Sequence, residues 1–233
     1  MISIHDFAFN PLRTRCCVVW DDSTKACAII DPGCCDDSEL GGLRSFIEER
    51  GLSPEYILLT HGHFDHIFGV QALADNYGIP VYMNGADAFL VDAAPASAAT
   101  FGIRCDNGFD FQYINVDEGD TFRIGSIILK AIHTPGHTPG GICYYDEADA
   151  VLFCGDTLFA GSIGRTDLPG GDYDSLIKSI MDKLMGLPGD VTFFPGHGPS
   201  STIGREATAN PFLIPFNEPE SDWDNLDALG LER

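Results

Sequence analysis

Hydrophobic and polar residues follow two different periods along the first third of the chain. Short apolar or alternating runs predict strands at residues 2–9, 16–20, 26–30 and 56–60. Between the last two of these strands, apolar residues recur at the spacing of one helix face, at Leu40, Leu43, Phe46 and Ile47. Residues 37–50 are therefore predicted to form a helix, which Gly51 ends.

The remainder of the chain repeats both patterns. Residues 67–78 are predicted to form an amphipathic helix closed by Gly78, and residues 172–185 a further helix. The other apolar runs predict strands at residues 78–83, 111–116, 121–124, 126–132, 142–145, 151–154 and 191–194. Residues 84–110 combine an alanine-rich helix former with Pro95, Gly102 and Gly108, so the pattern does not select one structure for them.

Strands and helices mixed in this order predict an α/β fold built from layers. The length of 233 residues is suited to one large domain, and neither a repeat nor a linker is visible. We assign residues 1–210 to this domain. Residues 211–233 are rich in proline, asparagine and acidic residues, and they are predicted to form an acidic surface tail of the same domain.

Charge and cysteine content indicate which partners and which cellular compartment the protein is suited to. Asp and Glu number 35 against 13 Lys and Arg, and a formal charge of −22 disfavours nucleic acid and anionic membranes as partners. No apolar run is long enough to span a membrane, and the N-terminus shows no signal-peptide pattern. The eight cysteines show no C-x-x-C spacing, so we expect reduced, mostly buried thiols in a cytoplasmic protein.

Potential ligands follow four of the predicted strands, at the point where each strand ends. The segment T-H-G-H-F-D-H places four of them after the strand at 56–60, and the other three follow later strands in H-T-P-G-H, G-D-T and P-G-H-G. Because strand ends of layered α/β folds share one crevice, we expect these side chains to converge. The candidate metal ligands are His61, His63, Asp65, His66, His137, Asp156 and His197.

Imidazole and carboxylate together suit zinc, iron or manganese. We expect two divalent ions, zinc first among these metals. His61, His63 and His137 would share one ion, and Asp65, His66 and His197 the other. Asp156 would bridge them, although G-D-T also fits a simple turn or helix cap. His5 and His133 are interpreted as ordinary polar residues. Two ions so held would activate a bridging hydroxide.

The motifs T-H-G-H-F-D-H, T-P-G-H-T, C-G-D-T-L-F and F-P-G-H-G, in this order, resemble the metallo-β-lactamase superfamily. The resemblance covers roughly residues 2–200 and implies an αββα four-layer sandwich. Residues 161–172, G-S-I-G-R-T-D-L-P-G-G-D, are similar to small single-domain hydroxyacylglutathione hydrolase (glyoxalase II) relatives. The resemblance implies hydrolysis of a small-molecule thioester. Cysteine commonly replaces Asp156 in two-zinc β-lactamases, so antibiotic hydrolysis is not expected.

Two residues receive further roles in this interpretation. Asp65 would act as a catalytic residue by steering the proton of the hydroxide. Arg165 would bind a substrate carboxylate, or alternatively form a salt bridge with Asp167. Residues 198–233 are not expected to form the C-terminal helical domain that helps full-length hydroxyacylglutathione hydrolases hold glutathione, so the thiol half of the substrate is not assigned.

Two other readings stay open. Persulfide dioxygenases of the same superfamily look similar and use one iron, which the resemblance would place on His61, His137 and Asp156. A protein that binds metal without catalysis is the third reading, although structural zinc sites are usually closed and often contain cysteine. The sequence leaves the metal, the number of ions and the oligomeric state undetermined.

Overall fold

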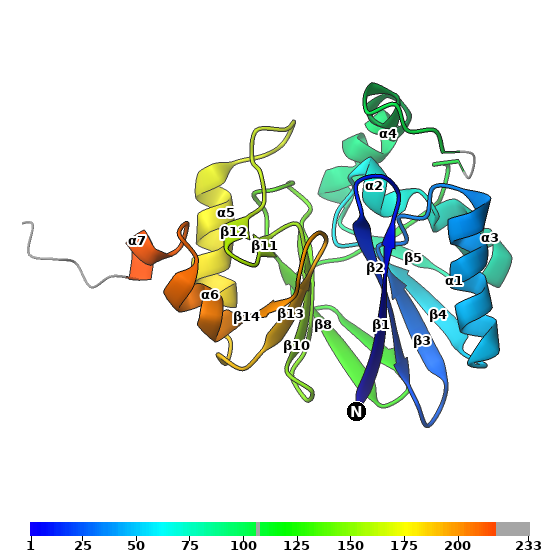
Figure 1. Cartoon of the computed structure of the whole chain (residues 1–233), viewed down its shortest axis with the longest axis horizontal. Coiled ribbons are helices and arrows are strands. Elements are labelled where there is room, and N and C mark those ends of the chain that lie inside the picture. The colour runs from blue at the N-terminus through cyan, green and yellow to red at the C-terminus, as the bar shows by residue number, and fades with distance from the viewer. Residues whose placement is uncertain (106–107, 218–233) are drawn as a thin grey trace, which may run out of the picture.

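Two six-stranded sheets lie face to face between two layers of helices in the computed structural model, which describes residues 1–105 and 108–217 (Figure 1). The predicted α/β four-layer sandwich is thereby confirmed. Apolar residues of the two inner sheet faces form one core cluster, and each outer sheet face forms another cluster with its helices. The order of the layers is therefore α, β, β, α.

The first sheet, sheet A, contains the N-terminal strands in chain order. Antiparallel pairing joins β1 to β2 and β2 to β3, and parallel pairing joins the rest. Its strands are β1 (Ile2–Phe9), β2 (Thr14–Asp21), β3 (Ala26–Ile30), β4 (Ser53–Leu58), β5 (Val81–Met83) and β6 (Ile114–Asn115).

The second sheet, sheet B, has the order β14-β13-β10-β9-β8-β7. Only β10 and β13 pair in parallel. Its strands are β7 (Thr121–Ile124), β8 (Ile127–His133), β9 (Ile142–Asp146), β10 (Val151–Gly155), β13 (Thr192–Pro195) and β14 (Ser201–Thr202). A separate short hairpin joins β11 (Leu158–Phe159) and β12 (Ser162–Ile163).

Helices cover the outer face of each sheet. Sheet A carries α1 (Asp37–Glu49), α2 (Phe64–Ile67), α3 (Val70–Tyr77) and α4 (Ala88–Thr100), with a 3₁₀ turn at Gly85–Asp87 before α4. Sheet B carries α5 (Tyr173–Ser179), which continues as a π-helical turn over Ile180–Leu184, followed by α6 (Ile203–Ala209) and α7 (Ile214–Asn217). Figure 1 shows these two groups at opposite sides of the paired sheets.

Most predicted elements are present, and the differences have local causes. The helix predicted over residues 67–78 is broken, because α2 ends at Ile67 and α3 begins at Val70. Gly69 lies between them, where a Cβ would collide with the Sγ of Cys34 and the carbonyl of Pro32. The strand predicted at residues 111–116 pairs only at Ile114–Asn115. The segment at residues 84–110 forms the 3₁₀ turn and α4, which tolerates Pro95 inside it.

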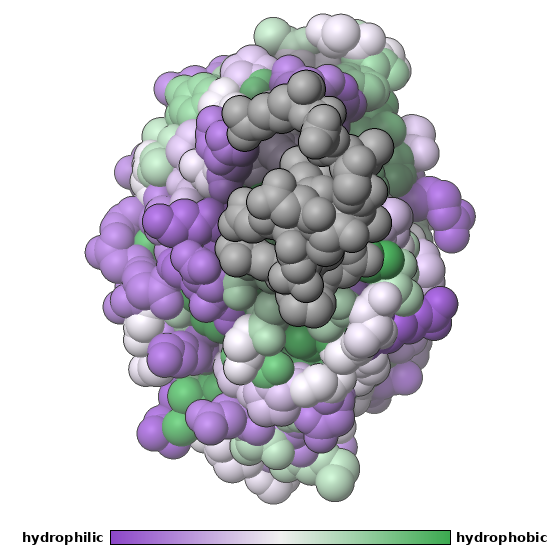
Figure 2. All heavy atoms as spheres, turned by 90° about the vertical axis from the view of Figure 1, so that its left-hand side faces the viewer, coloured by the Kyte–Doolittle hydropathy of each residue, from purple (hydrophilic) through white to green (hydrophobic). Residues whose placement is uncertain are grey.

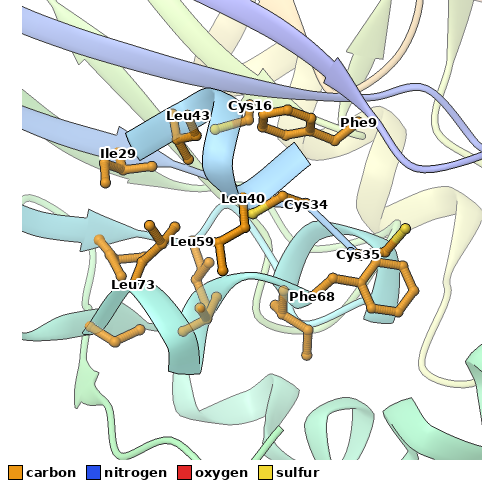
Figure 3. Packing of buried hydrophobic residues seen from close by; sticks show 14 of the residues in the cluster. Phe9, Cys16, Ile29, Cys34, Cys35, Leu40, Leu43, Leu59, Phe68 and Leu73 are labelled. Carbon is orange, nitrogen blue, oxygen red and sulfur yellow. The ribbon is translucent and has the colours of Figure 1, made fainter. Parts of the chain in front are cut away.

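All eight cysteines are free thiols, and seven of them are buried, as predicted. Figure 3 shows Cys16, Cys34 and Cys35 among hydrocarbon side chains such as Leu40 and Phe68, in the layer between sheet A and its helices. Burial raises the pKa of the Cys34 thiol to about 12, so it stays protonated at neutral pH. These thiols therefore act as small apolar core residues.

The far end of the chain closes the layer over sheet B. Leu213 is fully buried in the cluster beneath α5 and α6, so the chain still contributes to the core just past residue 210. Residues 218–233 of the predicted acidic tail lie outside the described residues. Figure 2 faces this layer and shows hydrophilic and hydrophobic residues interspersed around the grey region. Within the described ranges, no helix is long and apolar enough to cross a membrane.

Candidate metal centre

The seven candidate ligands lie at one end of the sandwich, where strands of both sheets stop. His61, His63, Asp65 and His66 follow β4 of sheet A. The ligands from sheet B are His137, Asp156 and His197, which follow β8, β10 and β13. The structure brings all seven side chains together, so the strand-end argument predicted their convergence correctly.

Three histidines form the first group, named here the three-imidazole cluster. One ring nitrogen from each of His61, His63 and His137 lies within 4.8 Å of the others. The Nδ1 of His63 is 2.9 Å from the Nε2 of His137. Both sheets contribute to this cluster, because His137 comes from sheet B.

The second group, named here the aspartate cluster, contains Asp65, His66 and His197, whose ligand atoms also lie within 4.8 Å of one another. The Oδ2 of Asp65 is 3.6 Å from the Nε2 of His66 and 3.4 Å from the Nε2 of His197. His66 is fully buried, whereas the His197 side chain is 30% exposed. The aspartate cluster thus opens toward solvent at His197.

Asp156 lies between the two clusters. Its Oδ2 is 3.5 Å from the Nε2 of His137 in the first cluster and 3.6 Å from the Nε2 of His197 in the second. Its Oδ1 is 3.6 Å from the Nε2 of His66. This is the position that a carboxylate bridging two ions would occupy. Gly196 makes room for it, because a Cβ there would collide with the Oδ1 of Asp156.

Hydrogen bonds outside the clusters decide which ring nitrogen of His61, His66, His137 and His197 faces inward. The Nδ1 of His137 donates to the carbonyl of Arg165 at 2.7 Å, and the Nδ1 of His197 donates to the carbonyl of Leu12 at 3.1 Å. A carbonyl can only accept, so each Nδ1 carries the proton and each Nε2 presents a lone pair toward the cluster, as a metal ligand must.

Asp31 orients histidines of both clusters. Its Oδ2 accepts from the Nδ1 of His66 at 2.9 Å and from the Oγ1 of Thr60 at 2.5 Å. Since the only hydroxyl proton of Thr60 goes to Asp31, its Oγ1 accepts from the Nδ1 of His61 at 3.0 Å. Asp31 also lies in a ligand-like group with His61 and His66, but these hydrogen bonds occupy its oxygens.

The sequence analysis did not identify Asp31, Thr60 or Thr14 as residues that support the candidate ligands. Thr14 donates its hydroxyl to the Oδ2 of Asp65 at 2.7 Å. Asn10 anchors the same region, since its amide donates to the carbonyls of Gly33 and Asp65. The D-P-G sequence directly after a buried strand was the available signal for Asp31, whereas nothing in the sequence distinguished Thr14.

Burial and neighbouring charges set the protonation of the clusters. Burial lowers the pKa of His61 and brings that of His63 to about 4, with the neighbouring imidazoles adding to the effect, so both rings are neutral at pH 7. Burial would also lower the pKa of His66, but Asp65, Asp31 and Asp156 outweigh it and raise this pKa to about 10. The aspartate cluster therefore attracts a positive charge.

The residues present fit a divalent metal. The Nε2 atoms of His61 and His66 and the Oδ1 of Asp156 are buried and have no hydrogen-bond partner among the described residues. Such buried polar atoms are costly unless they bind something. Nitrogen and carboxylate oxygen ligands without thiolate suit zinc, iron or manganese alike. His5 and His133 belong to neither cluster: His5 stacks on Phe46, and His133 donates to the carbonyl of Pro139.

A pocket of about 460 Å³ opens over the clusters. Its floor contains His63, Asp65, His137, Asp156 and His197. Its walls are mostly apolar, formed by Leu12, Phe64, Phe101, Phe159, Ile163 and Leu168. Phe101 comes from the end of α4, so the segment that the sequence left open does shape the pocket.

Arg165 lines the pocket, but its guanidinium is bound to Asp167. The Nε and Nη2 atoms donate to the two carboxylate oxygens at 2.7 and 2.8 Å. Of the two sequence-based alternatives, the structure thus shows the salt bridge, and the carbonyl of the same residue holds His137.

Comparison with known proteins agrees with this geometry. The family model described as the Metallo-beta-lactamase superfamily matches residues 10–197. Hydroxyacylglutathione hydrolase GloC of Haemophilus influenzae is 41% identical over 214 residues, which are 91% of this chain and 98% of the relative.

Two solved structures show the same fold. The BLEG-1 B3 metallo-beta-lactamase aligns with a TM-score of 0.79 and 39% identity, over 91% of this chain and 99% of that one. The protein TTHA1623, solved in a di-iron-bound form, aligns with a TM-score of 0.79 and 36% identity, over 90% and 100% of the two chains. A relative with this fold therefore holds two metal ions, and they are iron.

Proposed function

This chain belongs to the Metallo-beta-lactamase superfamily, and on that premise we propose that it is a metal-dependent hydrolase that cleaves small-molecule thioesters. One observation carries the proposal: six candidate ligands from both sheets gather in two clusters, and the carboxylate of Asp156 lies between them. The 41% identity to a hydroxyacylglutathione hydrolase supports the choice of substrate class.

Two divalent ions held by these ligands would activate a water molecule and polarise the substrate carbonyl. The protein's own groups prepare that chemistry. Asp31, Thr60 and the carbonyls of Arg165 and Leu12 fix the histidine rings, so little reorganisation accompanies catalysis. Asp65 is proposed to orient the attacking water by accepting a hydrogen bond from it, while Thr14 holds its Oδ2.

The pocket suits a thioester in two respects. Hydrolysis consumes one water and yields a carboxylic acid and a thiol, and a thiolate leaves without a strong general acid. The apolar walls offer contact to the acyl or thiol group, as pockets for small molecules usually do. Arg165 is retained as a candidate substrate contact because it lines the pocket, although it would have to exchange Asp167 for the substrate.

The test combines metal analysis with substrate turnover. We expect about two metal ions per chain and anaerobic cleavage of thioesters, measured as thiol release. Zinc, iron and manganese are each reloaded into chelator-treated protein, because the ligand types accept all three. Failure of the loaded protein to cleave any thioester in a panel of varied acyl and thiol groups would refute the proposal.

β-Lactam hydrolysis is the second candidate activity. The 39% identity to a protein named a B3 metallo-beta-lactamase weakens the expectation that Asp156 disfavours antibiotic hydrolysis. A β-lactam is therefore included in the same panel. One iron per chain with oxygen uptake on a persulfide would instead support the mononuclear dioxygenase, whose ligands would be His61, His137 and Asp156.

A further inference from the structure

A second compartment adjoins the metal centre at His197. It measures about 400 Å³ and is lined by residues of the β1–β2 hairpin together with His197 and Gly198. Leu12 and His197 line both this compartment and the pocket over the clusters. The compartment and the pocket over the clusters therefore adjoin at these two side chains.

This compartment has two cationic side chains, whereas Arg165 is, among the described residues, the one cation in the lining of the pocket over the clusters. Arg13 and Arg15 both line it, in a chain that has only 13 Lys and Arg against 35 acidic residues. Arg15 is already engaged, because it forms an ion pair with Asp6 and donates to the carbonyls of Pro195 and Gly198. The Asp6–Arg15 pair is neutral, so the charge of Arg13 remains uncompensated there.

Arg13 is exposed, and its side chain makes no ion pair or hydrogen bond within residues 1–105 and 108–217. Its backbone is nevertheless fixed. Arg13 has a φ of 57°, in the left-handed region that non-glycine residues rarely adopt, and its N–H donates to the carbonyl of Asn10 at 3.0 Å. Asn10 in turn is hydrogen-bonded to the site loops at Gly33 and Asp65.

The turn therefore presents an unpaired guanidinium from a backbone that is attached to the metal-binding loops. Figure 1 shows the β1–β2 turn at the same end of the sandwich as α2, which carries Asp65 and His66. A guanidinium recognises a carboxylate through two parallel hydrogen bonds. Arg165, the cation that lines the pocket over the clusters, already makes such a pair with Asp167.

We propose that Arg13 and the compartment beside His197 form a binding subsite for a carboxylate on the substrate, at the end remote from the scissile bond. This inference rests on the proposed function, since it assigns the charge of the substrate of that same site. The apolar pocket would hold the uncharged part, and Arg13 would select substrates that carry an anionic group.

The experiment uses two non-hydrolysable thioethers that differ only in ending with a carboxylate or a carboxamide. Binding to the metal-loaded full chain is measured by calorimetry. We expect the wild type to bind the carboxylate about tenfold more tightly, as fits a hydrogen-bonded charge pair at a partly exposed site. In Arg13→Gln this preference disappears. Arg123→Gln, which removes an exposed charge from β7 of sheet B, keeps it.

Three results would overturn the proposal: an equal affinity of the wild type for both thioethers, a preference that survives in Arg13→Gln, or one lost in Arg165→Gln instead. The matching thioesters are assayed in parallel to separate the two claims. Carboxylate binding that depends on Arg13 without any thioester cleavage would refute the proposed function alone. If both thioesters are cleaved and the ratio of their KM values is the same in the wild type and in Arg13→Gln, the subsite alone would be refuted.

Discussion

The two ligand clusters lie side by side but are held by different kinds of groups. In the three-imidazole cluster, His137 is fixed by a backbone carbonyl and His61 by the hydroxyl of Thr60, both neutral. In the aspartate cluster, one ligand is itself a carboxylate, and His66 is fixed directly by the carboxylate of Asp31. The aspartate cluster thus has more negative charge around its ligands.

This difference predicts that the two clusters bind their cations with different affinities and that the two cations differ in electrophilic strength. Charge-assisted hydrogen bonds are stronger than neutral ones and raise the basicity of the imidazole that donates them. The aspartate cluster should therefore bind its cation more tightly. The three-imidazole cluster supplies no negative charge of its own, so its cation should be held more weakly and act as the stronger electrophile. The following predictions test this comparison, from the largest expected effect to the smallest.

Asp156→Ala should impair metal binding at both clusters and so remove the difference between them, because Asp156 lies close to histidines of both. We expect metal content to collapse and hydrolysis to fall well beyond the roughly 10- to 100-fold that loss of an outer hydrogen-bond partner costs. Metal analysis and thiol release measure the two effects. His5→Gln, which alters a histidine stacked on Phe46, is the control. Full metal retention in Asp156→Ala would contradict its assignment as a bridge.

His63→Ala and His197→Ala each remove one ligand from a single cluster. We expect both variants to retain about one ion per chain and to lose activity by more than about 100-fold. Chelator titration then separates them. The wild type should release a weakly held ion first, and His63→Ala should lack that first release step. Identical titration curves for the two variants would show that the clusters do not differ in affinity.

Asp31→Asn should weaken both clusters, because Asp31 orients His66 directly and His61 through Thr60. We expect a loss of about 10- to 100-fold in metal affinity or activity. Thr60→Val is the matched variant, since it removes only the link to His61. If Thr60→Val affected the tightly held ion as strongly as Asp31→Asn, the proposed chain of hydrogen bonds would be incorrect.

Thr14→Val should produce the smallest change. It removes one hydrogen bond to the Oδ2 of Asp65, which retains its place beside His66 and His197. We expect activity to fall roughly tenfold, at the low end of outer-partner effects, with both ions retained. The kcat of metal-saturated protein measures this. A lost ion would mean that Thr14 is needed for binding rather than for the orientation of Asp65.

The sequence predicted the fold and the convergence of the seven candidate ligands far better than it predicted the residues that hold these side chains in place. Histidines at strand ends carry a recognisable spacing, and the ends of β4, β8, β10 and β13 meet because the sheets pair face to face. Thr14 contacts Asp65 across 51 positions of sequence through one common hydroxyl. A contact of this kind leaves no periodic signal.

Local sterics explain the elements that the sequence missed. Periodicity continued across Gly69, but α2 ends at Ile67 and α3 begins at Val70, and between them the backbone at Gly69 passes too close to Cys34 for any larger residue. Similarly, Arg165 had two plausible partners in sequence, and only the fold shows that Asp167 is within reach. Hydrophobic patterning reports which face is buried, whereas backbone clearance and side-chain reach depend on tertiary structure.

Each cluster takes ligands from both sheets, and this has a mechanical consequence. A cation coordinated by His61 and His137, or by Asp65 and His197, fastens the two halves of the sandwich together at one rim. Opening that rim would then require coordination bonds to break, so amide protons there should exchange with solvent more slowly in loaded than in metal-stripped protein. The resistance of the folded chain to opening at this rim would thus rise with the concentration of free metal.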